Sequence, residues 1–258
     1  MRHHRAAFTL VELAIVLVIL GLLVGGILTG EMLVRASQRR AIIVEYDRYT
    51  TAKNAFKDKY FQLPGDFNNA TSIWGIAGGT TGNDATCAAT ASTDVKTCNG
   101  DGDNVLLAST GSYEPGRYWQ HLSNAGLIEG RYNGLSGTVT GVNVPGSKFS
   151  ADAYWGVWNR GTAFSANPNA FDGPPVWNNY MTIASNTGHG LMTPSDAWNV
   201  DIKMDDGKPY AGKVMTTWGS ALSTTGTACT TAATSADFTA HYALTNENKD
   251  CVLWFNNI

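Results

Sequence analysis

The sequence predicts an α+β protein in which one long amino-terminal helix carries a globular head built on an antiparallel β-sheet. Residues 13–28 form an unbroken, almost wholly apolar run, and apolar side chains then recur at helical spacing as far as Leu63. Beyond Pro64 the segments become short, are interrupted by Gly, Asn and Pro, and are rich in Thr, Val, Tyr and Trp. Such segments are typical of strands and turns, so we expect residues 64–258 to form one head domain.

The composition excludes several classes of protein. The chain has 258 residues, of which 43% are hydrophobic and 15% are charged, with a formal net charge of −3. It therefore has no overall basic field of the kind that binds nucleic acid, and we expect no nucleic-acid partner. The length suffices for a buried core, and the 8 Trp and 10 Tyr argue against a disordered chain.

The segment 8–28 is expected to cross a membrane. As a helix its 21 residues would extend about 31 Å, which matches a hydrocarbon core of about 30 Å. A short basic leader, residues 1–7, precedes it and carries Arg2 and Arg5. Glu12 is the one charge inside this segment, where an unpaired carboxylate would cost a few kcal/mol.

Three interpretations of this amino end compete. A secretory signal would need a small-residue cleavage site after the apolar run, and none is evident there. A plain membrane anchor would not favour a carboxylate near its start. If instead the chain is cut before Phe8, Glu12 becomes the fifth residue, and the new amino group, of its own or a neighbouring subunit, neutralises the carboxylate.

The residues that carry this third interpretation also resemble a known family. Ala7-Phe8-Thr9-Leu10-Val11-Glu12-Leu13, followed by the apolar run, is similar to the leader motif of type IV pilins and type II secretion pseudopilins. The resemblance covers residues 2 to about 30 and implies a pilin-like fold. It further implies cleavage between Ala7 and Phe8 by a prepilin peptidase, methylation of Phe8, and subunit docking through Glu12. The family usually has Gly before the cut, where this chain has Ala7.

The charges around the span do not by themselves fix its orientation. Arg2 and Arg5 favour a cytoplasmic amino end, whereas Arg35, Arg39 and Arg40 follow the span closely and favour the opposite orientation. The resemblance to pilins implies that the head lies outside the cytoplasm.

The helix is expected to continue beyond the membrane, over residues 8–63 in all. Ile42, Tyr49, Phe56 and Leu63 recur every seven residues, which gives the helix an apolar side suited to packing against a head. Pro64 is expected to stop it. A helix of this length would extend about 84 Å.

In the head we expect one short helix and several strands. The helix is predicted over Arg117–Ala125, where Gly126 would stop it. Most of the Trp residues are explained by core packing, although Trp155 and Trp158, or Trp177, are candidates for an exposed carbohydrate-binding patch. The predicted strands are Thr138–Val144, Tyr154–Trp158, Tyr180–Ala184, Gly212–Thr217 and Cys251–Phe255.

Four cysteines, Cys87, Cys98, Cys229 and Cys251, allow three pairings, between which the sequence does not decide. We favour pairing of nearest neighbours, because each bridge would then close a loop that has little apolar content to hold it. A disulfide loop near the carboxyl end also resembles the corresponding region of pilins. Disulfides indicate an oxidising compartment, and the absence of a C-x-x-C spacing argues against zinc.

The string Asn99-Gly100-Asp101-Gly102-Asp103-Asn104 is the strongest ligand-like motif. Its alternating oxygen side chains resemble the first half of a calcium loop, with Asn99, Asp101 and Asp103 as candidate ligands and Glu114 farther along the chain. It is not a full EF-hand, because Thr110 stands where the bidentate glutamate would be. A solvated turn is the alternative, so Ca²⁺ is a candidate ligand and no cofactor is required. A second acidic group, Asp201, Asp205 and Asp206, is explained by a tight turn or by a cation.

No pattern of catalytic residues is present. Of the five histidines, His3, His4, His121, His189 and His241, none has metal-ligand spacing, and no phosphate-binding loop, dinucleotide fingerprint or nucleophile motif occurs. We therefore expect that the protein is not an enzyme.

The resemblance implies a structural subunit, major or minor, of a type IV pilus or a type II secretion pseudopilus. Such a subunit sits in the bacterial inner membrane with its head in the periplasm, in contact with lipid. An inner-membrane assembly platform then adds it to a homo- or hetero-oligomeric filament in the periplasm or outside the cell. The alternative from another class is a membrane-anchored, extracytoplasmic, calcium-dependent adhesin or binding protein.

Overall fold

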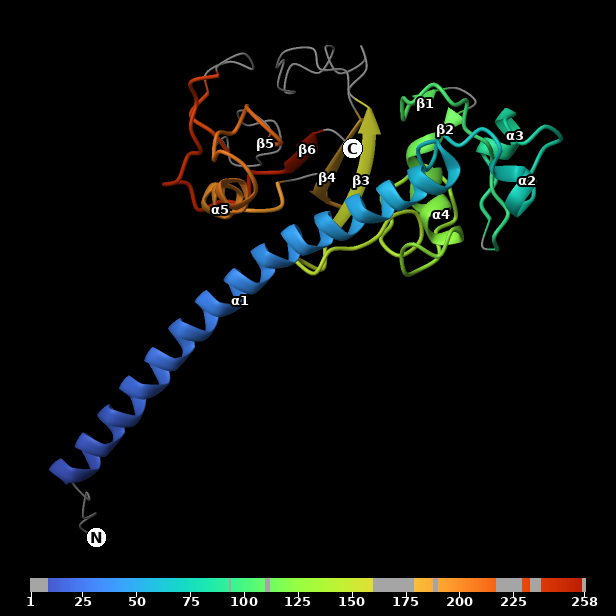
Figure 1. The fold of residues 1–258 in the computed structure, drawn as a ribbon. Helices are drawn as coiled ribbons and strands as arrows, with labels where there is room; N and C mark the ends of the chain where they lie inside the picture. The colour runs from blue at the N-terminus through green and yellow to red at the C-terminus, as the bar shows by residue number, and fades with distance from the viewer. Residues whose placement is uncertain are drawn as a thin grey trace, which may run out of the picture.

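The long helix and the head of the computed structural model are shown in Figure 1. The helix α1 spans Leu10–Tyr60, and its carboxy-terminal half lies along the head while its amino-terminal half projects away from it. This α+β arrangement is the pilin-like fold class that the sequence predicts. The structure describes residues 9–92, 94–109, 112–159, 179–187, 190–216, 229–232 and 238–256.

The helix α1 has 51 residues and therefore extends about 77 Å. It ends at Tyr60, three residues before the predicted end, because Phe61 adopts a left-handed conformation with φ 59° and donates its N–H to the carbonyl of Lys57. Leu63 is buried, but it packs from the turn after the helix and not from the helix itself. The buried side of α1 consists of Ile42, Glu45, Tyr46, Tyr49, Ala52 and Phe56.

Four strands form one antiparallel sheet in the order β3–β4–β6–β5. Trp155 pairs with Ile183 and Ile183 with Leu253, so these side chains share one face of the sheet. Tyr180 and Trp254 lie on the other face, in a second buried cluster. The strands are β3 (Ala153–Asn159), β4 (Asn179–Ser185), β5 (Val214–Thr216) and β6 (Leu253–Asn256).

Aromatic side chains join α1 to the first of these faces. The ring of Tyr46 stacks on Phe255 of β6 with centroids 4.6 Å apart, and Tyr49 meets the edge of Trp155 of β3 at 5.7 Å. Phe56 stacks on the ring of His121 at 6.2 Å. Rings of this size dominate the burial of apolar area, so they fix the head on the carboxy-terminal half of α1.

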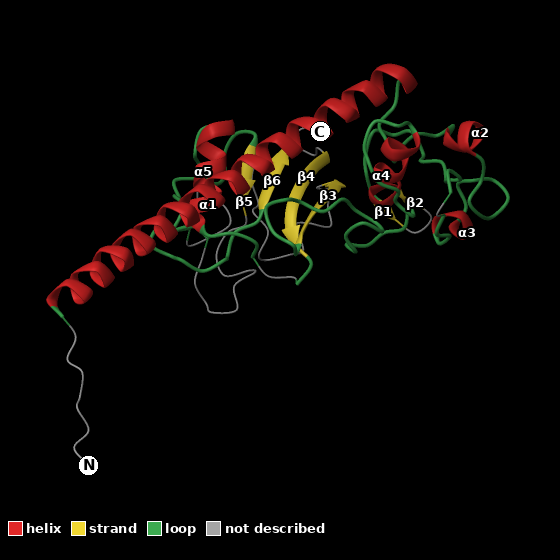
Figure 2. Ribbon diagram, turned by 90° about the horizontal axis from the view of Figure 1, so that it is seen from below, coloured by secondary structure: helices red, strands yellow, loops and turns green. Residues whose placement is uncertain are grey.

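The helix α4 (Glu114–Asn124) forms the centre of the part of the head near the end of α1 (Figure 2). It confirms the predicted helix and begins one turn earlier, and Gly126 follows its end with φ +73°. Trp119 of α4 meets Tyr49 of α1 at 4.9 Å. Around it lie α2 (Ala70–Trp74), α3 (Ala85–Ala88), β1 (Ala108–Ser109) and β2 (Ser112–Tyr113).

The helix α5 (Pro194–Met204) was not predicted. It packs beside α1, where Asp196 forms a salt bridge of 2.7 Å with Arg39. The amino end of α5 has a standard N-cap, because the side chain of Thr193 accepts a hydrogen bond from the N–H of Asp196. Pro194 is the first helical residue, and Thr-Pro is a helix start that can be recognised in the sequence.

Three of the five predicted strands are confirmed by β3, β4 and β6. The fourth, predicted over Gly212–Thr217, is confirmed only over β5, because Gly212 has φ +73° and the chain bends there, and Thr217 lies outside the described residues. The prediction of a strand over 138–144 is wrong. Gly137 and Gly141 have φ of +151° and +77°, and the chain turns there, with one isolated bridge between Thr140 and Val144. These two glycines interrupt the extended backbone that the neighbouring Val and Thr favour.

Candidate functional site

The exposed half of α1 is the first candidate site. Within the described residues, α1 is the one helix that is long and apolar enough to cross a membrane, and none of its most apolar window is buried against the head. Every large apolar side chain from Leu10 to Val34 is at least 51% exposed. An apolar surface of this extent needs a bilayer or other apolar helices to cover it.

Glu12 begins this exposed half and caps the helix. Its carboxylate accepts hydrogen bonds from the N–H and the hydroxyl of Thr9, at 2.8 and 2.9 Å, while the Thr9 hydroxyl accepts from the N–H of Glu12 at 3.2 Å. This reciprocal pair is a capping box, a role that the Thr-x-x-Glu spacing signals and that the sequence analysis missed. The candidate cleavage and methylation residues Ala7 and Phe8 lie outside the described residues.

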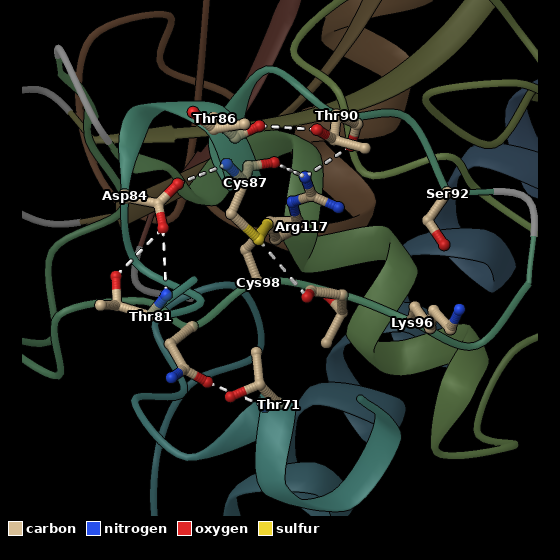
Figure 3. Close-up of a disulfide and its surroundings, with 12 residues drawn as sticks. Thr71, Thr81, Asp84, Thr86, Cys87, Thr90, Ser92, Lys96, Cys98 and Arg117 are labelled. Atoms are coloured by element: carbon tan, nitrogen blue, oxygen red, sulfur yellow. Dashed lines mark hydrogen bonds between the residues drawn. A yellow bond between two sulfur atoms is a disulfide. The ribbon is translucent and has the colours of Figure 1, made fainter. Parts of the chain in front are cut away.

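A disulfide joins Cys87 to Cys98 in the part of the head near the end of α1, with an S–S distance of 2.02 Å (Figure 3). Asp84 caps the short helix that carries Cys87, because its carboxylate accepts from the N–H of Cys87 at 2.8 Å. Arg117 of α4 donates to the carbonyls of Cys87 and Thr90, both at 2.9 Å. The loop is thus held by a covalent bridge and by side-chain bonds to α4.

Arg117 and His121, two buried side chains one turn apart on α4, both attach the disulfide loop to this helix. Burial lowers the pKa of Arg117 to about 10, so its guanidinium stays charged at neutral pH. Burial and the charge of Arg117 lower the pKa of His121 to about 3, so the ring is neutral. Its Nδ1 accepts from the N–H of Gly65 at 2.9 Å, which leaves Nε2 to donate to Thr97 or to the carbonyl of Cys98. His121 therefore ties the turn after α1 to the disulfide loop.

The second disulfide joins Cys229 to Cys251, so the structure contains the nearest-neighbour pairing that the sequence analysis favoured. Its Cα atoms are 5.0 Å apart, and it fastens the described segment 229–232 beside the start of β6. Cys251 also exchanges backbone hydrogen bonds with Met192, just before α5. The bridge thus reaches the elements of the head that flank α1.

The acidic loop that the sequence marks as a calcium candidate is gathered around two buried carboxylates. Asp66 accepts from the N–H groups of Gly102 and Asn104 at 2.6 and 2.8 Å. Glu114 accepts from the N–H groups of Asp101 and Leu107 at 3.2 and 3.0 Å. Carboxylate oxygens of Asp66, Asp101 and Glu114 lie within 4.8 Å of one another. Three such oxygens form part of a coordination shell for a hard cation.

The acidic group contains Asp66, which was not predicted as a ligand, and it lacks Asn99 and Asp103, which were predicted as ligands. Asp66 lies 35 positions before Asp101, and burial raises its pKa to about 6. The side-chain oxygen of Asn99 accepts from the N–H of Thr71 at 2.8 Å, and Asp103 accepts from the N–H of Val105 at 2.7 Å. These two are local turn and cap bonds.

The second acidic group lies at the end of α5. Oxygens of Asp201, Asp205 and Asp206 also lie within 4.8 Å of one another. Burial raises the pKa of Asp201 to about 7, and its carboxylate accepts from the hydroxyl of Tyr242 at 2.8 Å and the N–H of Gly207 at 3.2 Å. Asp205 bonds the N–H groups that lead into β5, so this group closes a turn between helix and strand.

Trp155 and Trp158 do not form the exposed carbohydrate-binding patch for which they were candidates. Trp155 is fully buried and donates its ring N–H to Glu45 at 2.8 Å, whereas Trp158 lies on the opposite face of β3. Neighbours separated by three positions in a strand point to opposite faces, which the sequence analysis overlooked. Trp177 lies outside the described residues.

The amino-terminal segment matches a family model. Residues 2–28 match the prokaryotic N-terminal methylation motif, which is the cleavage and methylation signal of precursors in the type IV pilin and pseudopilin family. Proteins with this motif are typically structural and not enzymatic, and the motif implies processing by a prepilin peptidase and assembly into a filament. No curated protein and no solved structure matches the chain. The motif and the long apolar helix together suggest a pilin-like subunit and fit a membrane-anchored or pilus location.

Proposed function

We propose that this protein is a structural subunit, major or minor, of a bacterial type IV pilus or type II secretion pseudopilus. The observation that supports this most directly is the exposed apolar half of α1, which overlaps the matched methylation motif. The same helix continues into a head that contains two disulfides. A soluble protein would not leave such a surface uncovered. The bilayer covers it before assembly, and the helices of neighbouring subunits cover it afterwards.

The proposed sequence of events begins in the inner membrane, with the head in the periplasm. A prepilin peptidase cuts between Ala7 and Phe8 and methylates the new amino group of Phe8. The inner-membrane assembly platform then moves the subunit out of the bilayer. Glu12 pairs with the amino group of a neighbouring subunit, which removes the penalty for a carboxylate in an apolar bundle. The capping box holds the Glu12 side chain close to the helix end, where an incoming amino group would meet it.

Processing is tested by mass spectrometry of the amino end, in cells with and without the prepilin peptidase. We expect a chain that starts at methylated Phe8 in the first case and an intact Met1 in the second. An intact Met1 in both strains, with no association with filaments, would support the anchored, calcium-dependent binding protein instead.

The charge of Glu12 is tested separately from its capping role. Glutamine preserves a capping box, so Glu12→Gln removes the charge and keeps the helix end. Glu31→Gln is the matched control, because Glu31 is a second exposed carboxylate in the same apolar half of α1. We expect Glu12→Gln to enter the membrane normally and to be lost from filaments, and Glu31→Gln to assemble. Normal assembly of Glu12→Gln would restrict Glu12 to helix capping.

A further inference from the structure

Cations follow the apolar half of α1 without a gap. Arg35 comes directly after Val34, and Arg39 and Arg40 follow within the next turn and a half, on the side of the membrane where the charge rule for membrane proteins disfavours them. Arg39 is compensated by its salt bridge to Asp196 in the head. For Arg35 and Arg40 no salt bridge occurs among the described residues. These two charges therefore serve neither the orientation of the span nor the attachment of the head.

The head adds two more cations beside them, and each pair lines a groove against α1. Arg40 and Lys148 line a groove of about 590 Å³ between α1 and the loop 146–148. Arg35 and Lys249 line a second groove, of about 810 Å³, between α1 and the segment 244–249. Lys148 and Lys249 are exposed and, like the two arginines, are without a salt bridge in the parts of the chain that the structure describes. We call Arg35, Arg40, Lys148 and Lys249 the exit cations.

Four carboxylates line the two grooves. Glu129 of the first groove lies 4.0 Å from Arg48 in an exposed ion pair, and Glu247 of the second groove is exposed. Glu45, which lines the first groove, is buried, and its oxygens accept from the Ser147 hydroxyl, the Lys148 N–H and the Trp155 ring N–H. It thereby fixes the loop that carries Lys148. Asp196, in the second groove, is paired with Arg39.

The position of the grooves along α1 brings them to the membrane surface. The apolar surface ends at Val34, and the first groove begins at Ser37, about 4.5 Å farther along the axis. The headgroup layer of a bilayer is about 5 to 7 Å thick on each side. The exposed apolar surface extends six residues beyond the expected span 8–28, and a tilt of α1 accommodates this extra length in the hydrocarbon. With the hydrocarbon edge at Val34, Arg35 lies within the headgroup layer, and Arg40 reaches it because helical side chains tilt toward the amino end. No linker separates the span from the head, since α1 is unbroken through both.

We propose that the exit cations bind the phosphate groups of anionic phospholipids in the leaflet from which α1 emerges. Before assembly, lipid headgroups occupy the two grooves and hold the head against the bilayer surface. Removal of the subunit into a filament would have to break these contacts. The inference rests on the membrane-inserted state in the proposed function and is independent of cleavage and filament formation.

The test uses the purified full chain in mixed micelles of phosphatidylglycerol and phosphatidylcholine, with retained lipids counted by native mass spectrometry. We expect the wild-type protein to retain phosphatidylglycerol preferentially. Arg35→Gln/Arg40→Gln and Lys148→Gln/Lys249→Gln should each reduce this preference, by about fivefold for each cation removed. Lys57→Gln/Lys59→Gln is the control with the same change in charge, at the far end of α1, and should retain the preference.

Three results would overturn the proposal. An unchanged preference in Lys148→Gln/Lys249→Gln would show that the grooves do not take part. Displacement of phosphatidylglycerol by an equal concentration of inorganic phosphate would indicate sites for free phosphate. If both variants keep the lipid preference but fail to enter filaments, the exit cations contact a second copy of this chain instead. Peptidase processing is measured on the same variants as a test of the proposed function. If processing is normal while the lipid preference is unchanged, the lipid-binding inference is wrong and the proposed function stands.

Discussion

Replacement of Glu45 should detach the head from α1 more strongly than the loss of any exposed charge. The carboxylate is 7% exposed and lies on the buried side of the helix. It accepts three hydrogen bonds from the head, at 2.6 Å from the Ser147 hydroxyl, 2.9 Å from the Lys148 N–H and 2.8 Å from the Trp155 ring N–H. Among the residues that the structure describes, these bonds join α1 both to β3 and to the loop that precedes it.

The magnitude follows from the donors that the change leaves without an acceptor. Each buried donor without a partner costs about 1–3 kcal/mol, so Glu45→Ala should lower the free energy of unfolding by about 3–5 kcal/mol once water reaches part of the site. Glu45→Gln keeps one acceptor oxygen but turns an amide N–H toward a donor, and it should lower the free energy of unfolding by about 1–3 kcal/mol. Asp47→Ala removes an exposed carboxylate two positions away and should change it by less than about 0.5 kcal/mol.

The assay is urea unfolding of the full chain in a mild detergent, followed by Trp fluorescence, because Trp155 is a direct partner of Glu45. The expected order of midpoints is wild type and Asp47→Ala, then Glu45→Gln, then Glu45→Ala. Equal midpoints for Glu45→Ala and Asp47→Ala would refute the view that this carboxylate fastens the head.

Three further changes have defined outcomes. The raised pKa of Asp201, about 7 against an ordinary 3.8, means that the folded state binds the proton more tightly. Stability should therefore increase as pH falls from about 7 toward 4, and Asp201→Asn should flatten that dependence in thermal melts. If the loop around Asp66 binds Ca²⁺, the ion should raise the melting temperature of the wild type but not of Asp66→Asn, and an identical melt in chelator would remove the site. Replacing Cys229 and Cys251 by Ser should lower the free energy of unfolding by about 3 kcal/mol, because the bridge closes a loop with a sequence separation of 22 residues. Full stability of the reduced protein would contradict that estimate.

The elements that the sequence predicts are those with a strong local pattern. The heptad of Ile42, Tyr49 and Phe56 gave the buried side of α1 correctly, because a 3.6-residue period directly specifies a helical face. The helix α5 was missed because its apolar positions are interrupted by polar ones, although Thr193 and Pro194 mark its start. The false strand at 138–144 arose because strand propensity does not register the left-handed conformation of Gly141 within it or the turn at Gly137 just before it.

The parts of the sites that the sequence did not predict depend on contacts between distant residues. Asp66 joins Asp101 and Glu114 only because the turn after α1 folds back onto α4. Glu45 looks like an ordinary solvated charge in a helix, and its burial follows from the position of Trp155, a separation of 110 residues. Glu12 was identified as a misplaced charge, whereas its capping bond follows from a spacing of three residues.

The continuity of α1 also has a mechanical consequence. The helix whose amino-terminal half is exposed also carries the rings of Tyr46, Tyr49 and Phe56, which pack against the head, and it has no break between Leu10 and Tyr60. A pull or twist applied at its amino-terminal end is therefore transmitted directly to the aromatic contacts, because no flexible joint lies between them. In the proposed filament, the rotation of each α1 about its own axis would therefore also set the orientation of its head.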